Sequence, residues 1–452
     1  MVRLCRPLSF LLFVSAALAQ QIAWAEDSTL RPPVELTREQ DRERLMGLLG
    51  IKTLRLGPTS RNEPQPGRFG LVNYDEAKAN PFPNLPPLLL TNARDQVTTP
   101  WLWLNVRRAE IVELFDREIY GRVPQQMPEV QWKVIDSKNV TQNGVAVTVR
   151  EVVGHVDNAA YPLLTVEIGL TVTTPADASG PVPMILRFSR RPLAGQPERP
   201  RPPIDAESVE SLVLARGWGY AALDTNSIQE DNGGGMTRGI IGLLNQGQPR
   251  DVDDWGALRA WAWAASRALD FFETDDAVDA KRVAVQGHSR YGKAALVAMA
   301  YDLRFATGDV SSSGEGGASL YRRNWGELIE NVTATTEYHW MAGNFLKYAG
   351  PLSWDDLPVD THQLIALCAP RPVFISGGDV GDEWVDAKGM FMAAAAAQPV
   401  WRLLGKKDMG TDEFPGLEVG LMDGEIAFRQ HAEGHTDRPN WPSFLDFAAR
   451  YF

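Results

Sequence analysis

The sequence contains very little cysteine. Only Cys5 and Cys368 occur in 452 residues, and Cys5 lies in an N-terminal segment with the features of a secretory signal. Once this segment is removed, a single cysteine cannot form an intramolecular disulfide, so stability must come from burial of a hydrophobic core. The remaining length of about 425 residues suffices for one elaborated α/β domain or two ordinary ones.

Long apolar runs and positive charge are also scarce. After the N-terminal segment, no stretch reaches the roughly 18 to 20 apolar residues that a membrane-spanning helix needs. The formal net charge is −12, from 45 Lys and Arg against 57 Asp and Glu. An acidic chain is poorly suited to nucleic acid or an anionic membrane, and we expect neither as a partner. No His/Cys cluster has zinc spacing and no G-x-G-x-x-G follows a predicted strand, so we expect no metal and no organic cofactor.

The chain divides into a leader, an arm and one main domain. Two arginines precede a mostly apolar run at residues 8–18, and small residues suited to cleavage follow. This pattern predicts a signal peptide over residues 1–25 and export to the periplasm or the extracellular space. Residues 26–96 are rich in Pro, Arg and Asn and predict an extended arm with one short helix near residues 38–49. Residues 97–452 are expected to form the main domain.

Hydrophobic patterning predicts an α/β fold with a mostly parallel central sheet, helices on both faces and antiparallel strands at the N-terminal side. Residues 224–252, rich in Gly and Asn, predict a loop that is either an active-site lid or a solvated insertion. Helices are expected over 101–120, over 254–273 and from 291. Strands are expected over 130–135, 145–153, 164–173, 182–188, 219–223, 283–285, 304–310, 372–376 and 399–404.

The strongest sign of chemistry is a turn between a predicted strand and a predicted helix. The apolar strand ends at Gly287, the turn contains Ser289, and an Ala- and Leu-rich helix pattern follows from Tyr291. This is the layout of a nucleophile elbow, which exposes a serine hydroxyl and places helix N–H groups where an oxyanion develops. Gly292 stands one residue later than the usual second glycine. The alternative is an ordinary strand–helix loop with an incidental serine.

A serine nucleophile of this layout needs a histidine that follows the last strands in the chain. Only His431 and His435 do so. We favour His435 because Gly434 before it permits a sharp loop turn, whereas His431 could be a surface residue. His288 is next to Ser289 in the chain but is expected to point away from it.

The acid that orients the histidine is expected in the loop after the strand at 372–376. A second acidic loop, with Glu315, follows the strand after the elbow. The carboxylates of the first loop are Asp379, Asp382, Glu383 and Asp386.

These residues and their surroundings resemble the glucuronoyl esterases, carbohydrate esterase family fifteen, of the α/β-hydrolase superfamily. Residues 287–293, GHSRYGK, are similar to the family's G-C/H-S-R-x-G-K elbow, which explains the late glycine. The resemblance extends in matching order over roughly residues 100–450 and suggests a bacterial member. Further similar blocks are Asp254-Trp255-Gly256, Trp261-Ala262-Trp263, Arg323-Asn324-Trp325-Gly326-Glu327, Ala369-Pro370-Arg371-Pro372, Asp382-Glu383-Trp384-Val385-Asp386 and Gly434-His435-Thr436.

The resemblance implies a monomeric serine carboxylesterase that needs no cofactor. Its expected substrates are esters between (4-O-methyl-)D-glucuronate side chains of xylan and lignin alcohols. The alternatives are another exported polysaccharide esterase, such as an acetyl xylan esterase or a uronate methyl esterase, or an inactive carbohydrate-binding protein. The implied catalytic residues are Ser289, His435 and Arg290, the last at the oxyanion, and the implied sugar-binding residues are Lys293, Glu327 and Trp384.

The acid is where this sequence departs from many family members. They carry a Glu at the position that aligns with Ser312, and serine cannot replace a carboxylate there. Other bacterial members use an Asp of the D-x-W segment, which corresponds to Asp382, and we predict Asp382 as the acid. Glu315 is the first alternative and Asp379 the second.

Overall fold

The computed structural model describes residues 30–59, 70–81, 84–191 and 208–452. Residues 33–452 form one compact unit, and of the unit before it only residues 30–32 belong to the described part. The predicted signal peptide lies outside the described residues. Among the helices in the described ranges, none combines the length and the apolarity needed to cross a membrane.

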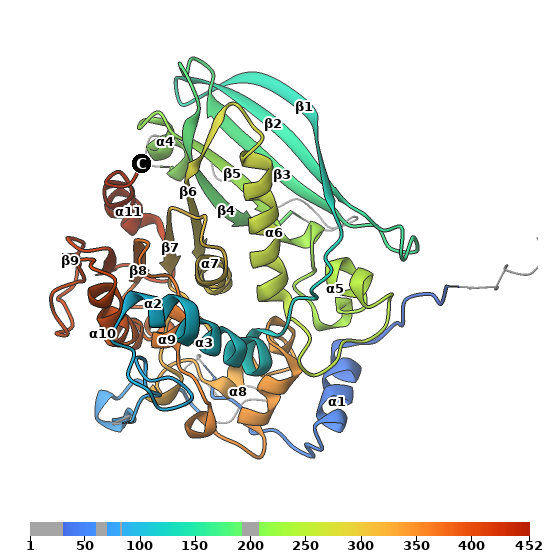
Figure 1. Ribbon diagram of the computed structural model, residues 1–452, viewed down its shortest axis with the longest axis vertical. Coiled ribbons are helices and arrows are strands. Elements are labelled where there is room, and N and C mark those ends of the chain that lie inside the picture. The colour runs from blue at the N-terminus through green and yellow to red at the C-terminus, as the bar shows by residue number, and fades with distance from the viewer. Residues whose placement is uncertain (1–29, 60–69, 82–83, 192–207) are drawn as a thin grey trace, which may run out of the picture. The chain divides into compact units, whose positions relative to one another are not determined.

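A ten-stranded mixed sheet organises the unit (Figure 1). Its strand order is β1-β2-β3-β5-β4-β6-β7-β8-β10-β9. The pairings from β1 to β5 and between β10 and β9 are antiparallel, while all pairings from β5 to β10 are parallel. The predicted fold class is therefore confirmed. The strands are β1 (Val130–Gln142), β2 (Val145–Val156), β3 (Glu167–Pro175), β4 (Val182–Ser189), β5 (Gly219–Asp224), β6 (Val278–His288), β7 (Thr307–Ser311), β8 (Val373–Gly377), β9 (Gly420–Leu421) and β10 (Ile426–Gln430).

Helices cover both faces of the parallel strands, as the continuous apolar runs predict. Successive side chains of a strand point to opposite faces. On β4, Met184 and Leu186 pack in the large core with α6, α7 and α10, while Ile185 packs with α4 and α11. The helices are α1 (Arg38–Leu48), α2 (Pro100–Leu102), α3 (Arg108–Phe115), α4 (Val209–Leu214), α5 (Gly239–Leu244), α6 (Ala257–Phe272), α7 (Arg290–Tyr301), α8 (Ile329–Val332), α9 (Thr361–Ala366), α10 (Ala387–Leu403) and α11 (Trp441–Ala448).

The predicted helix in the arm is confirmed as α1. Thr37 caps its first turn, since its hydroxyl accepts from Gln40 N while the Gln40 side chain accepts from Thr37 N. Leu45 on α1 packs against Tyr338 and Leu346, so the helix is attached to the rest of the unit by an apolar contact.

The strand predicted at residues 399–404 is wrong. These residues form the C-terminal end of α10, whose Ala-rich first half strongly favours a helix. Pro399 cannot donate to the carbonyl of Ala395, and the Gln398 side chain donates to that carbonyl instead, at 3.3 Å. The last parallel strand is β10, which the sequence reading missed.

Residues 224–252 are not a solvated insertion. The segment contains α5, whose Ile240, Ile241 and Leu243 are buried in the main core. The apolar side chains of the GIIGLL run favour a buried helix in spite of the glycines in the segment. The segment packs beside the C-terminal end of β4, where Thr225 donates to Ser189 O. It contributes Asp231 to the site described next.

Candidate active site

Ser289 lies in a tight turn between β6 and α7. Its backbone adopts φ 61° and ψ −130°, a conformation that costs energy for a residue with a side chain and is typical of a nucleophile elbow. Both flanking glycines are required by close contacts. A Cβ on Gly287 would lie 1.9 Å from Tyr291 O, and one on Gly292 would lie 2.6 Å from Ser311 O. The late position of the second glycine is thus explained by the approach of α7 to β7.

The structure brings His435 and Asp382 together. His435 Nδ1 lies 2.5 Å from Asp382 Oδ1, and the carboxylate is buried while the imidazole is partly exposed. Burial raises the pKa of Asp382, but hydrogen bonds from His435 and Ser312 outweigh burial and hold the pKa below its usual value. The acid is therefore ionised at neutral pH and can fix the tautomer of the histidine.

Ser312, at the position that aligns with the Glu of many family members, contacts the carboxylate of Asp382. Its hydroxyl donates to Asp382 Oδ2 at 2.7 Å, and the same oxygen accepts from Gly378 N at 2.8 Å. Ser312 itself adopts a left-handed conformation with φ 45°. The serine thus holds the carboxylate that comes from the other loop.

The alternative acids, Glu315 and Asp379, and the alternative base, His431, do not take part in the His435–Asp382 contact. Glu315 is fully buried, and its Oε1 has no hydrogen-bond partner among the described residues. Burial and the nearby Glu327 raise the pKa of Glu315 well above its usual value. Asp379 contributes backbone hydrogen bonds to the loops that carry Asp382 and His435. His431, expected at the surface, is instead buried, with its Nδ1 3.0 Å from Asn440 Nδ2.

His288, which precedes Ser289 in the chain, packs against His435. Its ring lies 4.4 Å from the ring of His435, centroid to centroid. Burial and the proximity of His435 lower the pKa of His288 to about 4, so it is neutral at neutral pH. A neutral ring here packs against His435 without adding a charge beside it.

Asp231 was missed by the sequence reading. Its Oδ2 lies 2.5 Å from Arg290 Nη1, and its Oδ1 accepts from Trp340 Nε1 at 2.7 Å and lies 3.0 Å from His339 Nε2. The guanidinium of Arg290 also lies 5.0 Å from the centre of the Trp340 ring. Arg290 is therefore held beside Ser289 by a buried carboxylate and an aromatic face. A single Asp in a Gly-rich segment gave no local signal of this contact.

Lys293 and Glu327 form a buried ion pair one helical turn from Ser289. Lys293 Nζ donates to Glu327 Oε2 at 2.8 Å and to the backbone carbonyls of Ser313 and Glu315 at 2.7 and 2.5 Å. All three ammonium protons are used inside the protein, so Lys293 orients Glu327. Glu327 N donates to Trp384 O at 2.8 Å, which links two of the three predicted sugar-binding residues directly.

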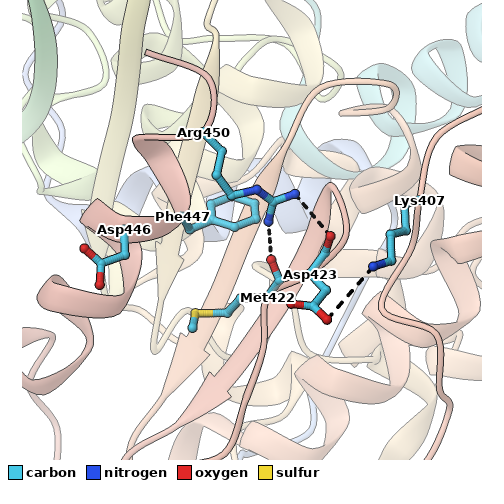
Figure 2. A pocket seen from close by; sticks show the side chains of 6 residues that line it. All are labelled: Lys407, Met422, Asp423, Asp446, Phe447 and Arg450. Carbon is cyan, nitrogen blue, oxygen red and sulfur yellow. Dashed lines mark hydrogen bonds and ion pairs between the residues drawn. The ribbon is translucent and has the colours of Figure 1, made fainter.

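Two cavities differ in their relation to these residues. One of about 610 Å³ is lined by both chain neighbours of Glu327, Gly326 and Leu328, and by Trp325 and Trp354. Figure 2 shows another, of about 510 Å³, near the C-terminus. There the Arg450 guanidinium donates to the carbonyls of Met422 and Asp423, and Lys407 pairs with Asp423 at 3.9 Å. Its fourth charged residue, Asp446, pairs with Arg216, and none of the predicted site residues lines this cavity.

Comparison with known proteins gives consistent results. The family model described as "Glucuronyl esterase, fungi" matches residues 164–405. A carbohydrate esterase of an unknown prokaryotic organism is 31% identical, over 83% of this chain and 91% of the relative. A 4-O-methyl-glucuronoyl methylesterase of Phanerochaete carnosa is 29% identical, over 80% of this chain and 81% of the relative.

Solved structures agree. A family-fifteen glucuronoyl esterase from Teredinibacter turnerae is 43% identical with a TM-score of 0.85, over 92% of this chain and 99% of that one. A glucuronoyl esterase from Solibacter usitatus is 35% identical with a TM-score of 0.74, over 84% of this chain and 100% of that one.

Fold and site together define a carboxylic ester hydrolase of the α/β-hydrolase class. The chain belongs to the glucuronoyl esterase family, carbohydrate esterase family fifteen.

Proposed function

We propose that this esterase hydrolyses the ester between (4-O-methyl-)D-glucuronate side chains of xylan and lignin alcohols, with Ser289 as nucleophile, His435 as base and Asp382 as acid. The observation that carries the assignment is the 2.5 Å contact between His435 Nδ1 and Asp382 Oδ1, in a histidine whose ring lies 4.4 Å from that of His288, the residue before Ser289 in the elbow. The relatives named 4-O-methyl-glucuronoyl methylesterases support the uronate as the acyl group.

The first step is acylation. His435 takes the proton of the Ser289 hydroxyl as its oxygen attacks the uronoyl carbonyl, and Asp382 stabilises the imidazolium that forms. The oxyanion develops at the N-terminus of α7, where helix N–H groups are available, and beside the Arg290 guanidinium. His435 then gives its proton to the departing alcohol.

The second step is deacylation. Water attacks the acyl-enzyme with His435 again as the base, and the uronate leaves with Ser289 restored. His288 is neutral at neutral pH, so it places no positive charge beside the His435 ring as that ring accepts the proton.

Recognition of the sugar is proposed for Glu327 and Trp384. Glu327 Oε2 is held by Lys293, while Oε1 has no partner among the described residues and is free to accept from a sugar hydroxyl. Trp384 offers an aromatic face to the pyranose ring, and its indole is partly exposed.

The test is release of benzyl alcohol from benzyl D-glucuronate by the wild type and by Ser289→Ala. We expect turnover in the wild type and none in the variant, with equal melting temperatures. Activity of Ser289→Ala near the wild-type level would remove the nucleophile assignment.

We also propose that the protein is exported as a monomer after loss of residues 1–25, with neither nucleic acid nor membrane as a partner. Residues 26–96 are proposed as the arm and residues 97–452 as the catalytic domain. The leader pattern and the acidic net charge of −12 support these assignments.

A further inference from the structure

A buried arginine, Arg323, connects three segments that are distant in the chain. Its Nε donates to both carboxylate oxygens of Asp386, at 3.0 and 2.7 Å. Its Nη1 and Nη2 donate to the two carboxylate oxygens of Glu76, at 2.8 and 2.5 Å. One guanidinium thus holds two carboxylates, which only its planar set of five donors permits.

The segments that contain Arg323 and Asp386 each carry a predicted sugar-binding residue. Arg323 stands four residues before Glu327, and Asp386 stands two residues after Trp384. The segments meet again where Glu327 N donates to Trp384 O. The Arg323–Asp386 ion pair and this backbone bond fix the two segments at two points, and therefore fix the separation of the Glu327 carboxylate from the Trp384 ring.

The third segment belongs to the arm. Besides Glu76, Asn80 donates to the carbonyls of both Arg322 and Arg323, at 2.6 and 2.8 Å, and Asn73 O accepts from Gly326 N at 3.2 Å. Asn73 also lines the 610 Å³ cavity beside Glu327. The arm therefore holds the segment 323–327 through Glu76, Asn80 and Asn73, in addition to the contact that Asp386 makes.

We propose that Glu76, Arg323 and Asp386 are positioning residues that set the geometry of the uronate cradle formed by Glu327 and Trp384, so that the arm takes part in substrate recognition. This rests on the proposed function, because it assumes that these two residues bind the sugar. None of the three touches Ser289, His435 or Asp382 in the hydrogen bonds of the described residues. Loosening them is expected to weaken binding of the uronate and to leave the chemistry of small esters unchanged.

The test compares Glu76→Gln with two controls. Glu76 is half exposed, so the substitution leaves folding intact. Asp75→Asn removes the same charge from the adjacent residue, which pairs with Lys78 rather than Arg323. Lys388→Met removes the other ion-pair partner of Glu76. Steady-state kinetics on benzyl D-glucuronate and on an aryl acetate, melting temperatures, and calorimetric binding of D-glucuronate are measured for each.

For Glu76→Gln we expect KM on the uronate ester and Kd for glucuronate to rise about 5-fold, which is about 1 kcal/mol. Its kcat, its aryl acetate kinetics and both control variants should match the wild type. Arg323→Lys keeps the charge but neither the bidentate contact to Glu76 nor the Nε contact to Asp386, and should raise KM further.

Equal KM and Kd values for Glu76→Gln and Asp75→Asn would overturn the inference, and so would a proportional loss on the aryl acetate, which indicates a general structural role. If the wild type binds glucuronate or hydrolyses its ester, and Glu76→Gln has the same KM and Kd, the positioning role is refuted and the proposed function is unaffected. If the wild type neither binds glucuronate nor hydrolyses its ester, the proposed function falls and the inference with it.

Discussion

Asp382→Asn is the substitution for which the structure makes the sharpest prediction. Asp382 Oδ2 accepts from Ser312 Oγ and Gly378 N, both of which are donors. In the asparagine variant the amide oxygen must remain on that side, so the NH2 group faces His435 Nδ1. That nitrogen then has to accept, which places the ring proton on Nε2, where the proton of Ser289 should arrive. The base is present but in the wrong tautomer.

The expected loss is large and confined to turnover. The wrong tautomer in a triad of this kind costs about 10⁴ in kcat, or about 5.4 kcal/mol of transition-state stabilisation. KM should change little because Asp382 contacts no sugar-binding group. Asparagine has the same shape and keeps the partners on Oδ2, so folding should be retained.

The assay is steady-state hydrolysis of benzyl D-glucuronate, with circular dichroism and melting temperature as checks of folding. Glu315→Gln and Asp379→Asn serve as matched controls. Burial raises the pKa of Glu315, and its Oε1 has no hydrogen-bond partner among the described residues, so its isosteric amide should retain wild-type activity. A folded Asp382→Asn with activity within about tenfold of the wild type, or a selective loss in Glu315→Gln, would refute the reasoning.

Further predictions concern the groups around this pair. Ser312→Ala removes a hydroxyl donor from a buried carboxylate and should lower the free energy of unfolding in urea by about 1.5–3 kcal/mol. Asp231→Asn leaves Arg290 without its carboxylate and should lower kcat on the uronate ester roughly tenfold, while Kd for glucuronate is unchanged. Because the folded-state pKa of Asp382 lies below 3.8, its carboxylate stabilises the fold above that pH, and the difference in unfolding free energy between the wild type and Asp382→Asn should shrink as pH falls below 3.8. Lys293→Met should raise KM on the uronate ester more than on an aryl acetate; equal effects would make it a purely structural residue.

The sequence predicts the elbow and the sheet because both depend on local patterns. Gly287, Ser289 and Gly292 stand within six residues, and a strand and a helix of strong periodicity flank them. The assignment of residues 399–404 failed because a short apolar run containing Val and Trp fits a buried strand and a helix end equally well. Only the helical continuation from the alanines before it separates the two readings.

The contacts that hold the site could not be predicted, since each joins residues far apart in the chain. From the sequence alone, Ser312 indicates only that a carboxylate is missing at this position. Its contact with Asp382, 70 residues later and 2.7 Å away, is known only from the folded chain. Asp231 reaches Arg290 across 59 residues, and Glu76 reaches Arg323 across 247. Charged side chains in loops carry no periodic signal, so only the folded chain identifies their partners.

The most direct test of the central claim is the ratio of kcat/KM values of the wild type for benzyl D-glucuronate and for an aryl acetate. A cradle built from Glu327 and Trp384 should favour the uronate ester by a wide margin, because the acetate has no sugar to bind. Faster hydrolysis of the acetate would contradict the account and indicate a general esterase on the same fold.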